Sequence, residues 1–110
     1  MFELITISDA LKRSYASEGI LIDVRSEEAY RKGHLPMAVH VSLEDILEGR
    51  YRPEGKKPVF LYCDTGLHSM LAARKLDEEG VQAYTVSGGL RLYRGYLEKE
   101  KNDLWTMVLH

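Results

Sequence analysis

The sequence predicts one α/β domain in which a mostly parallel sheet is flanked by helices. Short runs rich in Ile, Leu, Val, Phe and Tyr alternate with segments of helical periodicity, which is typical of parallel strands joined by crossover helices. The run at residues 20–24 carries apolar residues on both faces, as a central parallel strand does. No internal repeat, low-complexity tract or linker interrupts the 110 residues, and this length supports a single core.

The first half of the chain is expected to hold three strands and three short helices. Ser and Asp side chains accept hydrogen bonds from the free N–H groups at a helix start, and glycine favours a helix end. The expected strands are residues 2–6, 20–24 and 38–41. The helices are expected to begin after Ser8 or Asp9, after Ser26 and after Ser42, and to end at Gly19, Gly33 and Gly49.

The second half is expected to hold two strands and the longest helix. Pro58 opens a buried strand at residues 59–62, a second strand covers residues 81–86, and Gly88-Gly89 forms a tight turn. The long helix is expected over residues 67–79, with an inward face made of Leu67, Met70, Leu71, Ala73 and Leu76. A last helical spacing joins Leu90, Tyr93 and Leu97.

Composition and charge point away from several classes of protein. Apolar residues make up 45% and charged residues 29%, and the net charge of −2 offers no footprint for nucleic acid or anionic membrane. No apolar run reaches the length of about 18 residues that indicates a membrane span, and the first ten residues lack the pattern of a secretory signal. A lone cysteine cannot form an internal disulfide, so we expect a reducing, cytoplasmic location.

Cys63 is the candidate nucleophile, because it stands where a buried strand passes into a helix. Sites in parallel sheets form at the carboxyl ends of the strands. A helix start directs free N–H groups and partial positive charge at the preceding loop, which favours the thiolate form of a cysteine. The alternative is a buried structural cysteine followed by a turn. The four histidines and Cys63 show no spacing typical of metal ligands, so we expect no metal and no cofactor.

Three groups of residues resemble the signatures of the rhodanese domain family. They are Ile22-Asp23-Val24-Arg25 with Glu28, Tyr30, Gly33-His34-Leu35-Pro36 and Ala38; then Tyr62-Cys63 with Gly66 and Ser69; and finally Ser87-Gly88-Gly89. The resemblance extends from Leu4 to Leu97. It implies a three-layer rhodanese-like fold, with residues 1–110 as one domain, a core at about residues 4–97 and a C-terminal tail at 98–110.

The same resemblance implies a sulfurtransferase. Cys63 would accept a sulfane sulfur as a persulfide, and the loop after it would bind the substrate through residues Asp64, Thr65, Gly66, Leu67, His68 and Ser69. The donor would be a persulfide or thiosulfate, and the acceptor a thiol such as thioredoxin, glutathione or a partner protein. Converging N–H groups would stabilise the outer sulfur, and Gly66 would allow a positive φ.

Two loop residues depart from the family pattern. Members that use thiosulfate often carry arginine or lysine where this chain has Asp64 and His68. A carboxylate beside the sulfur raises the thiol pKa, whereas backbone dipoles lower it. We therefore expect a persulfide donor rather than dianionic thiosulfate. His68 either orients the substrate or is an exposed polar residue.

Other positions are expected to serve structure. Arg25 is predicted to pair with Glu27 or Glu28, and Asp23 to bind backbone near the end of its strand. His34 belongs to the turn before Pro36. Met37 replaces a glycine common in the family and could alter the turn, while Tyr93 replaces a frequent tryptophan and should still pack as an aromatic anchor. The apolar end of the tail either packs on its own domain or contacts a partner, so we expect a monomer or a weak dimer.

Two other function classes stay open. A rhodanese-like interaction module without catalysis would explain the loop departures, although the retained Cys63 and Gly66 argue against it. A related phosphatase or arsenate reductase has a loop one residue longer that ends in an arginine able to clamp an oxyanion. This chain has Ser69 there and no arginine before Arg74, which disfavours that class.

Overall fold

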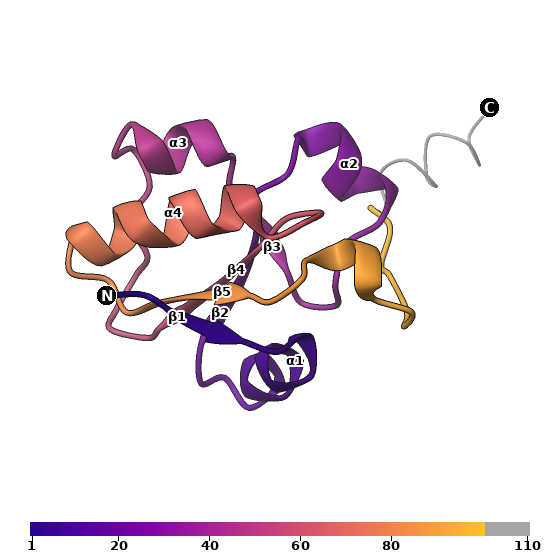
Figure 1. Ribbon diagram of the computed structural model, residues 1–110. Helices are drawn as coiled ribbons and strands as arrows, with labels where there is room; N and C mark the ends of the chain where they lie inside the picture. The colour runs from indigo at the N-terminus through magenta and orange to yellow at the C-terminus, as the bar shows by residue number, and fades with distance from the viewer. Residues whose placement is uncertain (101–110) are drawn as a thin grey trace.

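The computed structural model describes residues 1–100 and contains a five-stranded sheet in the order β1-β5-β4-β2-β3 (Figure 1). All four strand pairings are parallel, which confirms the predicted fold class. The strands are β1 (Glu3–Ile5), β2 (Ile20–Asp23), β3 (Val39–His40), β4 (Val59–Tyr62) and β5 (Ala83–Val86).

Helices cover both faces of this sheet. They are α1 (Ile7–Tyr15), α2 (Glu27–Lys32), α3 (Leu43–Leu47) and α4 (Leu67–Glu78), followed by the short 3₁₀ helix η1 (Leu90–Leu92). Figure 1 shows α3 and α4 on one side of the sheet and α1 on the other. No helix within residues 1–100 is long and apolar enough to cross a membrane.

The central strand β4 supplies both halves of the core. Val59 and Leu61 pack under α3 and α4, together with Ile46 and Leu76. The alternate residues of β4 belong to the second half of the core, on the side of α1, with Ala10, Leu21 and Leu35. Side chains alternate along a strand, so a strand buried on both faces must be apolar throughout. The uninterrupted apolar run of β4 therefore requires helices on both faces of the sheet, which gives three layers.

The expected helix starts are confirmed in two places and wrong in one. The side chains of Ser26 and Ser42 accept hydrogen bonds from the backbone N–H groups of Ala29 and Asp45, as N-caps do. The first helix is instead capped by Thr6, and it ends at Tyr15, well before the expected Gly19. A Cβ on Gly19 would lie 2.3 Å from a ring carbon of Phe60, so this glycine makes room for the core.

The expected inward face of α4 is confirmed at Ala73 and Leu76 and wrong at its other three residues. Leu67, Met70 and Leu71 are 62%, 42% and 43% exposed. The residues that face the sheet and the neighbouring helix are Ser69, Ala72, Ala73 and Leu76. They repeat at the same helical period, but three of them are small, which lets the helix lie close to the sheet. Hydrophobicity alone therefore placed three exposed residues on the inward face.

The last expected helix is also wrong beyond its first turn. η1 ends at Leu92, and Tyr93 has extended backbone with φ −80° and ψ 136°. Tyr93 and Leu97 still pack against the second half of the core, so the predicted aromatic anchor is present without a helix. Residue Glu98 pairs with His34 through an isolated antiparallel bridge. The predictions for the end of the tail fall on residues 101–110, outside the described part of the chain.

Candidate active site

Cys63 lies directly after β4, at the carboxyl end of the sheet's central strand. Its side chain is 2% exposed and contributes to the core under α4. The chain then turns through residues 64–66 and enters α4 at Leu67. This is the strand–loop–helix arrangement that the sequence predicts, and it places the sulfur in front of a helix start.

Backbone N–H groups converge on the sulfur. Gly66 N donates to Cys63 Sγ at 3.0 Å and Ser69 N at 3.4 Å, while Ser69 Oγ lies 3.7 Å away. Burial raises the pKa of the Cys63 thiol. The N–H and hydroxyl of Ser69 and the N–H groups of Gly66 and Thr65 lower this pKa, and together they outweigh the effect of burial. The result is a pKa below the ordinary value of a cysteine, which favours the nucleophilic thiolate.

Two glycines shape the loop. Gly66 has φ +102°, as the sequence predicts, and this left-handed conformation turns its N–H toward the sulfur. Gly89 also has a positive φ, and a Cβ there would lie 2.4 Å from Asp64 O, within the loop backbone. Leu90 N donates to Cys63 O at 2.8 Å, so the turn after β5 holds the loop from outside.

Ser69, in the first turn of α4, is fully buried beside the sulfur. Its Oγ is 2.6 Å from Thr85 Oγ1 and donates to Gly66 O at 3.1 Å. These bonds fix the first turn of α4 to β5 and to the loop. Thr85 was missed by sequence reasoning, although a buried hydroxyl residue in an apolar strand is a usable signal for such a support.

The predicted partners of Arg25 are wrong. Its Nε and Nη2 bind the Asp23 carboxylate at 2.7–3.1 Å, and Nη2 also donates to Gly33 O at 2.6 Å. Glu27 and Glu28 instead pair with residues one turn along their own helix. Asp23 does bind backbone as predicted, because Arg25 N donates to its Oδ1 at 2.8 Å.

Asp64 is paired, which the sequence did not indicate. Its side chain is 66% exposed, and its Oδ1 lies 3.5 Å from Arg25 Nη1. The guanidinium offsets the charge of the carboxylate. The remaining loop residues Thr65, Leu67 and His68 are exposed. Both roles considered for His68 stay open.

His34 and Tyr62 serve the scaffold beside the loop. His34 is buried, stacks on the ring of Tyr30 at 3.9 Å, and places Nδ1 2.9 Å from Tyr30 O. Tyr62 Oη accepts a hydrogen bond from Leu35 N at 3.0 Å. Burial and the charge of Asp23 raise the pKa of Tyr62 far above its ordinary value. The predicted structural role of His34 agrees with these contacts.

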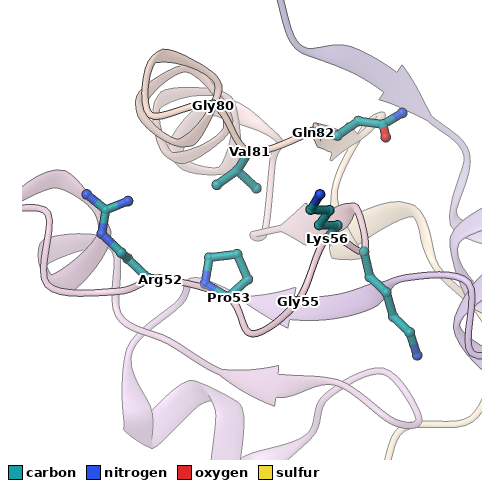
Figure 2. Close-up of a pocket in the computed structure, with 8 residues that line it drawn as sticks. Arg52, Pro53, Gly55, Lys56, Gly80, Val81 and Gln82 are labelled. Carbon is teal, nitrogen blue, oxygen red and sulfur yellow. The ribbon is translucent and has the colours of Figure 1, made fainter.

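Two hollows differ in their relation to the sulfur. One of about 380 Å³ adjoins the loop and is lined by Leu4, Met70, residues 65–67 and residues 85–88. The other, of about 410 Å³, is lined by Arg52, Pro53, residues 55–57 and residues 80–82 (Figure 2). Residues 57 and 82 precede β4 and β5, so this second hollow lies at the amino ends of the strands, away from Cys63. The first hollow thus adjoins the loop that follows Cys63, and Cys63 is not among its lining residues.

Comparisons with known proteins agree with this arrangement. The family model for the rhodanese-like domain matches residues 6–95. A tRNA sulfurtransferase from Desulfurococcus amylolyticus is 46% identical over 88 residues, which are 80% of this chain and 17% of that protein. The thiosulfate sulfurtransferase GlpE of Coxiella burnetii is 27% identical over 97 residues, 87% of this chain and 91% of that protein. A rhodanese homolog from the extremely thermophilic bacterium Thermus thermophilus superposes with a TM-score of 0.66 and 30% identity, covering 83% of this chain and 99% of the other.

Proposed function

Because the chain belongs to the rhodanese-like domain family, we propose that Cys63 is the nucleophile of a sulfurtransferase that carries sulfane sulfur as a persulfide. The observation that carries the proposal is the convergence of the Gly66 and Ser69 N–H groups on Cys63 Sγ, with the lowered pKa of the thiol. The chain spans only a small part of its tRNA sulfurtransferase relative. The proposal therefore does not include the substrates of that protein.

The first step is attack of the Cys63 thiolate on the outer sulfur of a donor. With a donor persulfide, an S–S bond forms to Cys63, the donor's own S–S bond breaks, and its electron pair leaves with the donor as a thiolate. With thiosulfate the leaving group is sulfite. In either case the terminal sulfur keeps its formal charge near the loop N–H groups, which act as an anion-binding nest.

The second step returns the enzyme to its thiolate. An acceptor thiolate, or cyanide in an assay, attacks the outer sulfur, and the electron pair of the Cys63 S–S bond returns to Cys63. The sequence contains a single cysteine, so an internal disulfide cannot release the sulfur. Acceptors of this kind are thioredoxin, glutathione or a partner protein. The two half-reactions predict ping-pong kinetics.

The donor is proposed to be a persulfide rather than thiosulfate. Asp64 adds a carboxylate at the exposed rim of the loop, and the loop itself contains no arginine or lysine. The loop therefore supplies a dianion with no arginine or lysine of its own to neutralise it, and a neutral or singly charged persulfide needs that compensation less. We also propose a cytoplasmic location, since a reducing compartment preserves the free thiol that this chemistry requires.

Intact-mass measurement tests the proposal directly. The wild-type protein is incubated with a small-molecule persulfide, separated from the donor, and weighed; we expect the added mass of one sulfur atom. Cys63→Ser is the control and should remain unmodified. Subsequent cyanide should remove the sulfur and yield thiocyanate in equal amount. A wild-type protein that stays unmodified with both persulfide and thiosulfate would refute the proposed function.

A further inference from the structure

Arg25 extends from the end of β2 to the catalytic loop, and only one of its nitrogens faces that loop. Nε and Nη2 are held by the Asp23 carboxylate and Gly33 O, at distances of 2.6–3.1 Å. The side chain is 10% exposed, and its carbon Cζ lies 5.8 Å from the centre of the Tyr62 ring. These contacts hold the guanidinium in one place.

The third nitrogen, Nη1, is held by a longer and weaker contact than the other two. Within residues 1–100 its ion-pair partner is Asp64, at 3.5 Å, which is longer than a strong hydrogen bond. Asp64 is mostly exposed, and such a pair contributes little to stability because water and salt screen it. The carboxylate can therefore be displaced, whereas the guanidinium cannot move away.

We propose that Arg25 and Asp64 form a specificity pair, in which Arg25 Nη1 is an anion-binding group at the loop rim and the Asp64 carboxylate occupies it. The proposal rests on the proposed function and names the residue that decides which donors Cys63 accepts. A dianionic donor must displace the carboxylate before it can use the guanidinium. A donor without a second charged group has no need of that cation.

The charges around the loop come from two separate parts of the chain. The loop contains no arginine or lysine, yet the partly buried Arg25, held by Asp23 at the end of β2, reaches Asp64 next to Cys63. Burial lowers the pKa of Arg25, but hydrogen bonding and charge from Asp23 raise it above its ordinary value, so the cation persists at every working pH. Asp64 thus masks a permanent positive charge rather than adding an uncompensated negative one.

The test is the change in donor preference caused by Asp64→Asn. The measured quantity is kcat/KM for thiosulfate divided by kcat/KM for hydroxyethyl persulfide, which carries no charge outside its sulfur. We expect this ratio to rise at least about fivefold, the factor that corresponds to an exposed ion pair at the upper end of its range. Asp45→Asn is the matched control, because it removes one carboxylate from another exposed arginine pair. An equal rise in both variants would assign the effect to net charge and overturn the proposal.

Arg25 itself is followed in two ways. Arg25→Lys, introduced into Asp64→Asn, should return the ratio to the wild-type value if the double variant folds. Independently, sulfate is titrated while the ¹⁵N resonance of the Arg25 side chain is recorded; it should shift in Asp64→Asn at sulfate concentrations that leave the wild type unchanged. An Arg25 signal that sulfate does not move in Asp64→Asn would overturn the proposal. The titration needs no turnover, so it separates failure of the specificity pair from failure of sulfur transfer at Cys63.

Discussion

Replacing Gly66 with alanine should lower both the free energy of unfolding and the tendency of Cys63 to form a thiolate. Gly66 has φ +102° and directs its N–H at Cys63 Sγ from 3.0 Å. A Cβ there would lie 3.7 Å from Val86 O, an ordinary contact, so the cost is conformational rather than steric. The backbone relieves this strain by rotating, and the rotation turns the N–H away from the sulfur.

Two opposing effects set the size of the stability change. The left-handed region costs a residue with a Cβ about 1–2 kcal/mol. The smaller freedom of alanine in the unfolded chain offsets about 0.4–1 kcal/mol of that cost. We therefore expect the free energy of unfolding of Gly66→Ala to fall by about 1 kcal/mol. A hydrogen bond to a charged group contributes about 1.5–3 kcal/mol, so its loss should lower the acid dissociation constant of the Cys63 thiol by at least about tenfold.

Denaturant unfolding and the rate of iodoacetamide alkylation measure the two effects. Gly80→Ala is the matched control, because Gly80 also has a positive φ of +87°, open space around it and a position at the far end of α4. Both variants should lose similar stability, and only Gly66→Ala should alkylate more slowly. If both variants alkylate at the wild-type rate, the Gly66 N–H does not stabilise the thiolate and the account of the lowered pKa is wrong.

Titration, burial and backbone strain each give a further prediction. The ionised Cys63 thiolate should stabilise the wild type relative to Cys63→Ala. This difference in the free energy of unfolding should be full above the unfolded thiol pKa of about 8.5 and be lost as the pH falls through the lowered folded pKa. Unfolding measured across this pH range that shows no such loss would contradict the prediction. Met70→Gln should change the free energy of unfolding by less than about 0.5 kcal/mol, whereas Leu76→Ala should lower it by about 2–5 kcal/mol. Met37 has φ +70°, so Met37→Gly should raise the melting temperature slightly through relief of up to about 1 kcal/mol of strain, and a lower melting temperature would show that the turn is not strained.

Local signals in the sequence predicted most of the elements. A serine before a helix satisfies free N–H groups whatever lies elsewhere in the chain, so Ser26 and Ser42 could be assigned as caps in advance. The apolar run at β4 requires cover on both faces, which already implies three layers. A glycine between a strand and a helix predicted the positive φ of Gly66.

The incorrect predictions concern which side of an element meets its neighbour. On α4, the stripe of Leu67, Met70 and Leu71 and the stripe of small residues through Ala73 share the same period. The distance at which the helix packs on the sheet decides between them, and the small residues allow the closer approach. Likewise, the helical spacing after Gly89 gave no sign that the backbone N–H groups of residues 90 and 91 bind the carbonyl oxygens of Cys63 and Asp64.

The sequence by itself determined that Cys63 stands at a strand–helix junction in a parallel α/β domain, because a buried strand, a turn and a helix start are local features. Only the tertiary structure decided the charge around that cysteine. Arg25 lies far from Asp64 in the chain, and β2 and β4 bring them together as adjacent parallel strands that end at one edge of the sheet. Electrostatic interactions depend on distance in space, so residue types and local spacing could name Asp64 as unusual but could not identify the guanidinium that pairs with it.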